Sequence, residues 1–414
     1  MFRISQAFYL YGMIPFSPPR IDQAIIDEVV DTLKSGWITT GPKTLKFEVA
    51  LMAYCGNKAT VCVGSATAGM HLVLHWLGVG PGDEVIVPAY TYCATANVVE
   101  HLGATVVFAD VNELDFNIGL KSIADKITSK TKAIMPVDIG GYPCDYDEIM
   151  ALVEANASIY EGRTEVQKKL GRIAIIADAA HSLGATYQGE RTGTCADVSV
   201  FSFHAVKNLS TAEGGAIAFN LPDAFDCDEL RKAFKTKSLH GQSKDAFAKM
   251  QVGGWRYDVI EAGFKCNMTD IQASMGLVEL ARYEENLERR QQIFALYTDL
   301  LREYDWAHCP RFRTGAKESS FHLYLLRIRG ASEDQRNEII KLISEDEVAV
   351  NVHYLPVPAM THYSSKGYRL DDYPQAKANY ENEITLPVYY NLTDKDVEIV
   401  AKSVVKAVQS VLNA

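Results

Sequence analysis

The chain has 414 residues, 48% of them hydrophobic and 22% charged, which is typical of a globular protein with two or three packed units. Its formal net charge of −11 argues against a dedicated nucleic-acid-binding protein. No apolar stretch reaches the roughly 18 residues needed to cross a bilayer. The N-terminus lacks the apolar core of a signal peptide. We therefore expect neither a nucleic-acid nor a membrane partner.

The eight cysteines are scattered along the chain and form no Cys-x-x-Cys pair; they occupy positions 55, 62, 93, 144, 195, 227, 266 and 309. In a chain of this length, such a spread is typical of reduced thiols rather than of a disulfide framework. We expect a cytoplasmic protein, and we predict no metal site.

The N-terminal half alternates helical and strand patterns. Ile21, Ile25, Val29 and Leu33 recur every four residues and predict an amphipathic helix, and the loop 36–42 separates it from a second helix that ends near Tyr54. Short apolar runs then predict the strands Ala59–Val63, Glu84–Pro88, Thr105–Ala109, Lys132–Val137, Ile173–Ala177, Val198–Phe203 and Gly215–Phe219. This alternation predicts an α/β fold with a mostly parallel seven-stranded sheet flanked by helices. Residues 158–171 are polar and are interpreted as a surface extension.

From Thr269 the pattern changes to a long helical stretch that reaches about Glu303. It is followed by a predicted strand at Phe321–Arg329, a helix at Glu333–Ser344, a strand at Val348–His353 and a last helix at Asp394–Leu412. We expect a large domain at 21–268, a smaller α+β C-terminal domain at 269–414, and an N-terminal segment, 1–20, that packs near the small domain.

Two predicted strands end at residues with reactive side chains. Asp178 directly follows the strand Ile173–Ala177, and Ser202 precedes Lys207 in the run Ser-Phe-His-Ala-Val-Lys. Open α/β sheets bind ligands beyond the carboxyl ends of their strands. An amine for a Schiff base, a carboxylate for a pyridinium nitrogen and a hydroxyl for a phosphate are what pyridoxal 5'-phosphate (PLP) requires. The sequence therefore predicts a PLP enzyme in which burial lowers the pKa of Lys207.

Further residues fit this interpretation, although each has a structural alternative. Gly64–Gly69 lies between a strand and a helix, where free amides attract a phosphate, or it is an ordinary turn. Asp178 could instead cap the following helix. Tyr92, after the strand Glu84–Pro88, could stack on the pyridine ring or pack in the core. His181 could lie against the ring or its 3'-oxygen, or be structural.

With these motifs assembled, the chain resembles the DegT-type aminotransferases, a PLP-dependent nucleotide-sugar family of fold type I. The resemblance covers nearly the whole chain and includes SGWITTGP, GSATAGMHL, GDEVIVPAYTYCATANVV, DAAHSLGA, SFHAVKN, GFKCNMTDIQA, HYLPV and ITLPVYYNLT.

The resemblance implies that Lys207 forms the Schiff base, that Asp178 binds the pyridine nitrogen, that His181 lies at the 3'-hydroxyl side, and that Tyr92 stacks on the ring. Ala66, Thr67 and Ser202 would hold the phosphate. Asn267 would reach the phosphate of the neighbouring subunit, because family active sites are shared across a homodimer. The sugar pocket would be lined by Trp37, Ile38 and Thr39, with His353 nearby.

Two departures from the family pattern bear on the substrate. Many members have Gly-Tyr-Asn-Tyr-Arg where this chain has Gly263-Phe264-Lys265-Cys266-Asn267, a version similar to the branch that aminates carbon 4 of UDP-linked 4-keto sugars. Many members also have a histidine soon after the His-Tyr-x-Pro motif, whereas Val357 and Pro358 follow here.

The function implied is a two-stage transamination. L-Glutamate would give its amino group to PLP, leaving 2-oxoglutarate and pyridoxamine 5'-phosphate, and a nucleotide-linked keto sugar would then take up that group, with Lys207 moving the proton in both stages. The alternatives are amination at carbon 3, a sugar 3-dehydratase (disfavoured because that relative has His in place of Lys207), and a non-catalytic binding or regulatory protein on the same scaffold.

Overall fold

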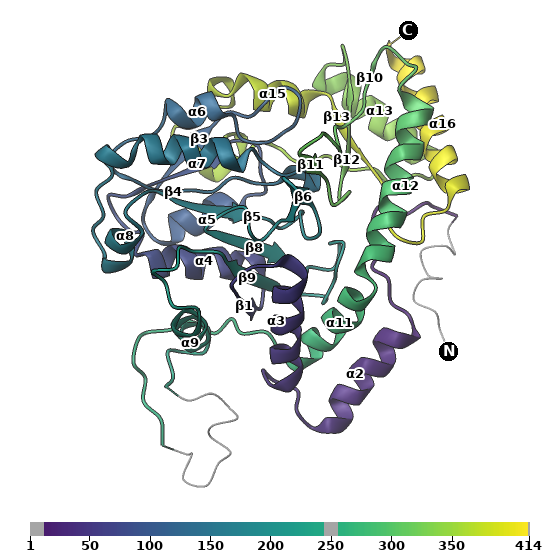
Figure 1. Cartoon of the computed structure of the whole chain (residues 1–414). Coiled ribbons are helices and arrows are strands. Elements are labelled where there is room, and N and C mark those ends of the chain that lie inside the picture. The colour runs from purple at the N-terminus through teal and green to yellow at the C-terminus, as the bar shows by residue number, and fades with distance from the viewer. Residues whose placement is uncertain (1–11, 244–255, 413–414) are drawn as a thin grey trace.

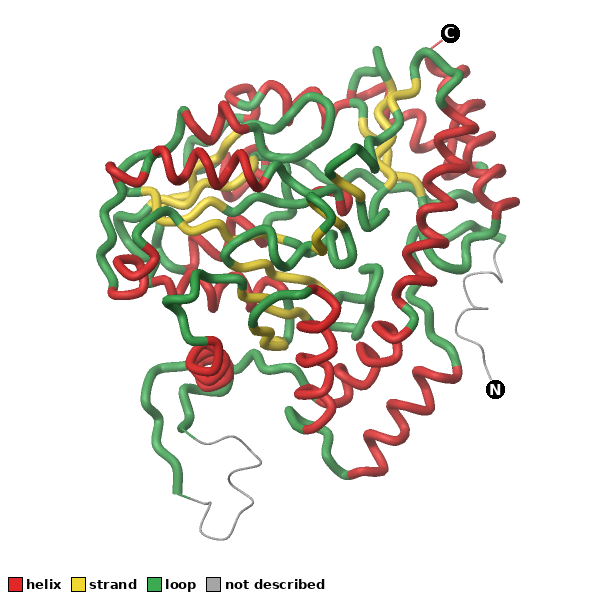
Figure 2. Tube along the Cα trace, in the orientation of Figure 1, coloured by secondary structure: helices red, strands yellow, loops and turns green. Residues whose placement is uncertain are grey.

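The computed structural model describes residues 12–243 and 256–412. A seven-stranded sheet with the order β1-β9-β8-β5-β4-β2-β3 forms its centre (Figures 1 and 2). β9 is antiparallel to both β1 and β8, and the remaining neighbours are parallel. The strands are β1 Ala59–Val63, β2 Glu84–Pro88, β3 Thr105–Ala109, β4 Thr131–Ile134, β5 Ala174–Asp178, β8 Val198–Ser202 and β9 Gly215–Phe219. The predicted fold class is confirmed.

The large sheet is buried on both faces, which explains why its strands are nearly continuous apolar runs. Successive side chains of a strand point to opposite faces. Accordingly, Val61 and Val63 belong to one hydrophobic cluster and Cys62 to the other. The first cluster includes α4 (Ala66–Leu77) and α5 (Ala94–His101), and the second includes α3 (Pro42–Cys55), α6 (Leu120–Ala124) and α7 (Tyr146–Ala155).

The predicted surface extension at 158–171 lies at the surface: its residues are exposed or half-buried, except for Gln167. It contains α8 (Glu165–Leu170), in which the Gln167 side chain is completely buried. Thr164 caps α8, and its hydroxyl donates to the Leu77 carbonyl at the end of α4. The segment is therefore anchored to the body of the molecule by one buried polar side chain and this hydrogen bond.

A second region lies beyond the large sheet and has its own hydrophobic cluster. Its sheet has the order β10-β12-β13 and is antiparallel. The strands are β10 Ala307–His308, β12 Tyr324–Ile328 and β13 Glu383–Leu386, and the helices packed with them are α12 Tyr283–Leu301, α13 Glu333–Glu345 and α16 Asp394–Leu412. Ile14 joins this cluster, and its N–H donates to the Glu347 carbonyl at 2.8 Å.

Shorter elements complete the described chain. A small sheet, β11-β6-β7, pairs Lys317–Glu318 with Thr186–Tyr187 and so links sequence-distant segments. The remaining elements are β7 Glu190–Arg191, α2 Gln23–Ser35, α9 Cys227–Ser238, α11 Asp270–Ala281, α14 Thr361–Ser364, α15 Pro374–Glu381 and the 3₁₀ turns Ile139–Gly141, Ala157–Ile159, Val357–Ala359 and Leu370–Asp372.

Two predicted elements differ in the structure. Residues 348–353 form no strand; Val348 and Asn351 make isolated bridges to Ile14 and Thr385. The segment pairs with one neighbour at Val348 and with another at Asn351, so it forms no continuous ladder of hydrogen bonds with either. Its alternation of apolar and polar residues therefore does not indicate a strand. The long helical stretch from Thr269 is two helices, α11 and α12, separated at Arg282.

The amphipathic pattern of α2 correctly predicts a helix, but most of its apolar side chains are not buried. Ile25 is 3% exposed, whereas Ile26 is 44% and Leu33 52% exposed. In Figure 1, α2 projects from the body of the molecule beside α11, whereas α3 packs against the large sheet. An apolar helix face is therefore left uncovered in a single chain.

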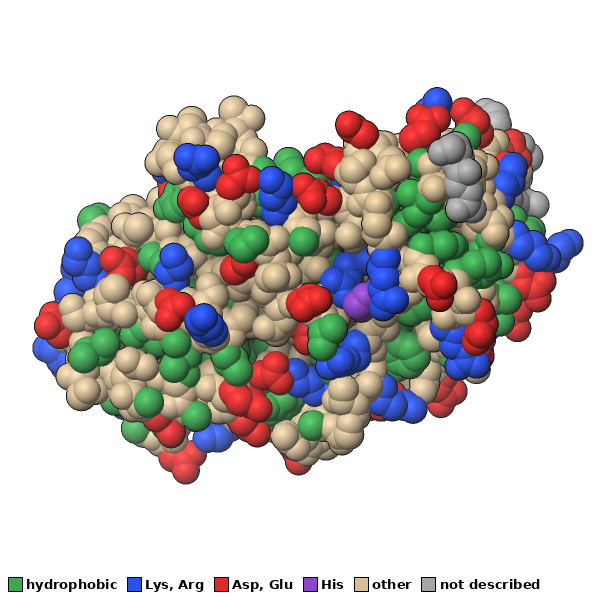
Figure 3. Space-filling model, turned by 90° about the horizontal axis from the view of Figure 1, so that it is seen from above, with side chains coloured by type: hydrophobic (Ala, Val, Ile, Leu, Met, Phe, Trp, Pro, Cys, Tyr) green, Lys and Arg blue, Asp and Glu red, His purple; other side chains and the backbone are tan. Residues whose placement is uncertain are grey.

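Figure 3 shows acidic and basic side chains interspersed over the face seen from above. Among the described residues, no helix is both long enough and apolar enough to cross a membrane.

Candidate active site

Asp178 is a buried carboxylate at the carboxyl end of β5. It is 5% exposed, and it accepts hydrogen bonds from the Thr95 hydroxyl at 2.7 Å and from the Ala180 N–H at 3.2 Å. Burial raises the pKa of Asp178, while these two hydrogen bonds and the Lys207 amine act in the opposite direction. A cation placed next to Asp178 would therefore stabilise its buried, charged form.

Lys207 lies in the loop after β8 and is half-buried. Loss of hydration lowers the pKa of its amine to about 8, and the Asp178 carboxylate opposes that shift. A much larger fraction of Lys207 than of an ordinary lysine is therefore neutral near physiological pH. A neutral amine is the form that acts as a nucleophile and accepts a proton.

A cavity of about 160 Å³ opens beside the Lys207 side chain. It lies where the two regions of the chain meet, because β13 and the segment 351–354 contribute to its wall. The polar side chains that line it are Ser17, Lys207, His322, Asn351, His353 and Tyr354. Ile38 and Thr39 are not among its lining residues.

Two buried histidines next to this cavity are uncharged. Burial lowers the pKa of both His181 and His322 well below its usual range, and the Lys207 charge adds to this effect. The Nδ1 atom of His181 accepts from the Gly140 N–H at 3.3 Å, so Nε2 carries the proton and donates to the Tyr354 hydroxyl oxygen at 3.1 Å. The Tyr354 O–H is thereby left free to donate elsewhere.

The first turn of α4 meets the ends of three strands. Ser202 pairs with Gly215, Gly215 pairs with Val63, and a Cβ atom on Gly215 would lie 2.6 Å from the Ala66 nitrogen. Glycine is therefore required for this close approach. Ser65 caps the helix by accepting from the Ala68 N–H at 3.1 Å. The structure brings Ala66 and Ser202 to one edge, as predicted for a phosphate cradle, with Thr67 in the same turn.

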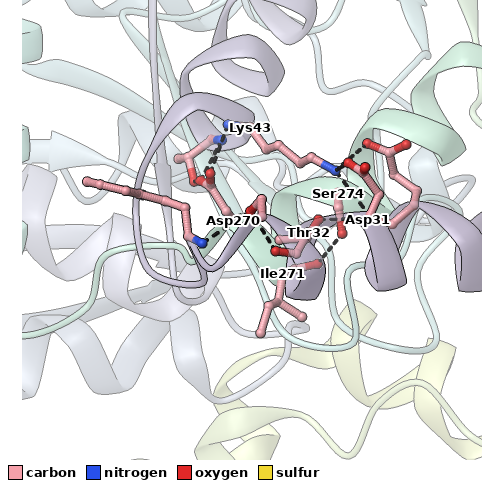
Figure 4. A network of polar contacts seen from close by, with 10 residues as sticks. Asp31, Thr32, Lys43, Asp270, Ile271 and Ser274 are labelled. Carbon is pink, nitrogen blue, oxygen red and sulfur yellow. Dashed lines mark hydrogen bonds and ion pairs between the residues drawn. The ribbon is translucent and has the colours of Figure 1, made fainter. Parts of the chain in front are cut away.

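The predicted sugar-pocket residues Trp37, Ile38 and Thr39 lie in the loop between α2 and α3. Asp270, at the start of α11, fixes the end of this loop (Figure 4). Its carboxylate accepts from the N–H groups of Gly41, Lys43 and Thr44 at 2.8–3.0 Å, and from the Thr44 hydroxyl at 2.7 Å.

Asn267 lies beside the same loop. Its side-chain amide donates to the Thr40 hydroxyl at 2.6 Å, and its side-chain oxygen accepts from the Lys265 amine. Ile38 is 50% exposed. The 37–40 loop and Asn267 thus form a second group of predicted site residues, apart from the group around Lys207.

Tyr92 is 57% exposed, and its ring lies 5.7 Å from that of Tyr354 at an angle of 52°. It is not a core residue, so its structural alternative is excluded. His353 lines the cavity with Lys207, and its place near the sugar stays a prediction.

Sequence reasoning missed Thr95, Tyr354, His322 and Asn208. Thr95 bonds Asp178, Tyr354 bonds His181, and Asn208 accepts from His322 Nδ1 at 2.8 Å. Two of these residues lie next to predicted site residues in the sequence: Thr95 follows Tyr92 by three positions, and Tyr354 follows His353 directly. This closeness in sequence could have identified them. His322, in the predicted strand Phe321–Arg329, carried none.

The chain matches the DegT/DnrJ/EryC1/StrS aminotransferase family over residues 19–405 and belongs to that family. This confirms the predicted enzyme class, an aminotransferase, and its cofactor, PLP, and it excludes the non-catalytic alternative. The residues of the site fit that cofactor. Lys207 supplies an amine of lowered pKa and Asp178 a buried carboxylate that a cation would stabilise. The N-terminus of α4 lies close to the strand ends because residue 215 is a glycine.

Individual relatives agree. Spr1654 of Streptococcus pneumoniae, described as a sugar aminotransferase and solved in its PMP form, is 46% identical, with a TM-score of 0.93 over 96% of this chain and 100% of its own. The Bacillus subtilis spore coat polysaccharide biosynthesis protein SpsC is 35% identical over 94% of this chain and 96% of its own length. PseC of Helicobacter pylori, an aminotransferase involved in pseudoaminic acid biosynthesis, is 27% identical, with a TM-score of 0.83 over 96% of this chain and 100% of its own. This chain is a sugar aminotransferase.

Proposed function

We propose that this enzyme transfers the amino group of L-glutamate to carbon 4 of a UDP-linked 4-keto-6-deoxy sugar in the cytoplasm, for the biosynthesis of a surface polysaccharide or another glycan such as lipopolysaccharide. The single observation that carries the transfer chemistry is the pair formed by the Lys207 amine and the buried Asp178 carboxylate, whose charges influence each other's pKa. The likeness to SpsC supports a polysaccharide product.

When bound, PLP supplies the carbonyl carbon that takes up the amino group and a ring that accepts electrons from the reacting carbon. Asp178 would hold the proton of the ring nitrogen, which supplies the cation that its buried carboxylate needs. Ala66, Thr67 and Ser202 would bind the phosphate, and His181 and Tyr92 would lie against the ring.

Lys207 would perform the proton transfers. Its neutral amine removes the proton from the α-carbon of L-glutamate, and in the second stage it delivers a proton to the former carbonyl carbon of the sugar. With a pKa of about 8, the Lys207 amine is present in similar amounts in its neutral and protonated forms near pH 8. This suits a group that must both accept and donate a proton.

Carbon 4 is preferred over carbon 3 because of the segment 263–267. Lys265 and Asn267, which distinguish the carbon-4 branch in sequence, are hydrogen-bonded to each other, and Asn267 is also tied to Thr40 in the 37–40 loop. The distinguishing residues therefore adjoin the predicted sugar-pocket loop. Amination at carbon 3 remains the alternative function.

We also propose a homodimer with shared active sites, in which Asn267 reaches the phosphate of the partner's site. The uncovered apolar side chains of α2 and α3 support a second copy as the occupant, because large exposed apolar patches mark interaction surfaces. They are Ile26, Val30, Leu33, Leu45 and Val49.

The test is a reaction with ¹⁵N-labelled L-glutamate and a panel of UDP-, dTDP- and GDP-linked 4-keto and 3-keto sugars. The proposal predicts ¹⁵N at carbon 4 of a UDP-linked product, located by NMR. Label at carbon 3 would establish the alternative, and label in no sugar of the panel would contradict the proposed substrate class.

A further inference from the structure

His353 is held by a buried pair of side chains on β13 that the transfer chemistry does not use. Its Nδ1 atom lies 2.9 Å from the Thr385 hydroxyl, and its backbone N–H donates to Glu383 Oε2 at 3.0 Å. Thr385 is in turn hydrogen-bonded to Glu383 Oε1 at 2.5 Å. Glu383 and Thr385 are both 0% exposed. A continuous chain of hydrogen bonds thus runs from a buried carboxyl group to the histidine ring.

The ring of His353 is also fixed from other sides. Phe16 stacks on it with ring centroids 5.5 Å apart and an angle of 25°. The Tyr90 hydroxyl donates to the His353 carbonyl at 2.5 Å. His353 lines the Lys207 cavity, and within the described part of the chain its Nε2 atom has no hydrogen-bond partner. Nε2 is therefore the atom that remains to meet a ligand.

We propose that Glu383 and Thr385 form a positioning relay that sets which nitrogen of His353 carries the ring proton, and thereby whether His353 accepts or donates a hydrogen bond in the Lys207 cavity. This inference rests on the proposed function only for the identity of the ligand. The relay itself is a property of the protein and is measurable without substrate.

The two states follow from the donors and acceptors in the chain. When Glu383 is ionised it can only accept, so Thr385 donates to Glu383 and accepts from Nδ1–H of His353, and Nε2 presents a lone pair. When Glu383 is protonated it donates to Thr385, Thr385 donates to Nδ1, and Nε2 carries the proton. A carboxylate ligand can pair only with the second state, whereas a sugar hydroxyl can pair with either.

The surroundings allow both states. Burial raises the pKa of Glu383 to about 8, opposed by Thr385, the His353 N–H and the nearby Arg336. Burial and the Lys207 charge lower the pKa of His353 to about 4, so its ring is neutral while Glu383 titrates. Arg336 Nη1 donates to the backbone carbonyl of Glu383 at 3.1 Å, and Arg327 on β12 is the cross-strand neighbour of Glu383. The other ionisable groups facing the relay are Tyr90, Tyr354, Lys207, His181 and His322.

Substitutions separate the states. In Glu383→Gln, the side-chain oxygen can accept from the His353 N–H while the NH₂ group donates to Thr385, which holds His353 in the Nε2–H form at every pH. Thr385→Val removes the hydroxyl at nearly constant volume and breaks the relay. Thr385→Ser is the matched control, because it keeps the hydroxyl and loses only a methyl group.

The experiment is ¹H–¹⁵N NMR of the histidine-labelled protein from pH 6 to pH 10, with the His353 signal identified by its loss in His353→Gln. We expect wild type and Thr385→Ser to change from Nε2–H to Nδ1–H with a midpoint near pH 8. Glu383→Gln should stay Nε2–H, and Thr385→Val should lose the transition. If wild type keeps one tautomer throughout, or if Thr385→Ser and Thr385→Val behave alike, the relay is overturned whatever the enzyme's substrate. The wild-type titration decides even if a variant fails to fold.

Discussion

The group around Lys207 and the group around Trp37 and Asn267 are built differently. Asp178, His181 and His322 are buried and hydrogen-bonded inside one chain, with their pKa values moved by burial and by the charge of Lys207. Ile38 is 50% exposed, and Asn267 is tied to Thr40 and Lys265 beside the uncovered apolar face of α2 and α3. The first group is held by contacts within one chain; the second lies at the surface of the chain.

This difference separates the two tasks of the enzyme. Proton transfer requires groups of altered pKa, and these require burial. Recognition of the proposed nucleotide-linked sugar would use contacts that, in the proposed homodimer, a second copy of the chain completes. Substitutions in the first group should therefore affect chemistry, and those in the second should affect stability, cofactor retention or substrate affinity.

Replacing Lys207 by alanine should have the largest effect. Turnover should fall by about 10⁴-fold or more, because the nucleophile and the proton-transfer group are lost together. The fold should be retained, since Lys207 lies half-buried in the loop after β8 rather than in the hydrophobic core. Steady-state rates and circular dichroism of the same preparation check both parts. Glutamate-driven turnover near the wild-type rate would contradict the assignment.

Asp178→Asn should lower kcat by about 10²–10⁴-fold. The substitution keeps the shape of the side chain but removes the charge that would hold the ring nitrogen protonated. Thr95→Val is the matched comparison: it removes only the hydroxyl that donates to Asp178, so the loss should be smaller. Equal losses in the two variants would mean that the position of the carboxylate, rather than its charge, matters.

The reactivity of Lys207 in the cofactor-free protein should depend on pH with a midpoint near 8. Because the pKa is lowered, the neutral fraction at pH 8 should exceed that of an ordinary lysine about 100-fold. Competitive labelling with an amine reagent, read by mass spectrometry against exposed Lys402, measures this ratio. A midpoint above pH 10 for Lys207 would contradict the proposed burial effect.

The second group can be tested by mixing subunits. Lys207→Ala should be almost inactive and Asn267→Ala weakly active, but a randomly reassociated equal mixture should recover about a quarter of the wild-type activity if each site takes one residue from each chain. Refolding the two variants together and separately supplies the comparison. No recovery in the mixture would place both residues in the site of one chain.

Asp270→Ala should have the smallest effect on chemistry and a clear effect on stability. Its carboxylate accepts four hydrogen bonds that fix the start of α3, so its loss should cost about 2–4 kcal/mol of unfolding free energy. The KM for the sugar should rise while the half-reaction with glutamate is unchanged. The control is Asp226→Ala at the exposed cap of α9, with an expected cost of about 1 kcal/mol.

The sequence predicted the elements that local patterns determine. β1, β2, β3 and β9 have the predicted bounds, because their apolar runs are bounded by polar or turn residues. Asp178, Ser202 and Lys207 were recognised because strand ends and residue types suffice to place them. The strand predicted at residues 348–353 is absent from the structure. The alternation of apolar and polar residues there is the same as in a strand, but the segment makes only isolated bridges.

The contacts that shape the site were not predictable from local pattern. The hydrogen bond from Thr95 joins residues 83 positions apart, and the bond between Tyr354 and His181 spans 173. The relay of Glu383 and Thr385 depends on where β13 lies against the segment that carries His353. The Thr95–Asp178 contact depends on how α5 packs on the large sheet, and the other two depend on how the segment around His353 and Tyr354 packs against its neighbours; local sequence patterns display neither.

An absorbance titration of the purified, cofactor-loaded enzyme tests the transfer of the amino group through Lys207. L-Glutamate should remove the visible absorbance of the bound cofactor, a UDP-linked 4-keto sugar should restore it, and Lys207→Ala should show neither change at a comparable rate. Absorbance that does not respond to L-glutamate in the loaded wild-type enzyme would contradict the proposed transamination.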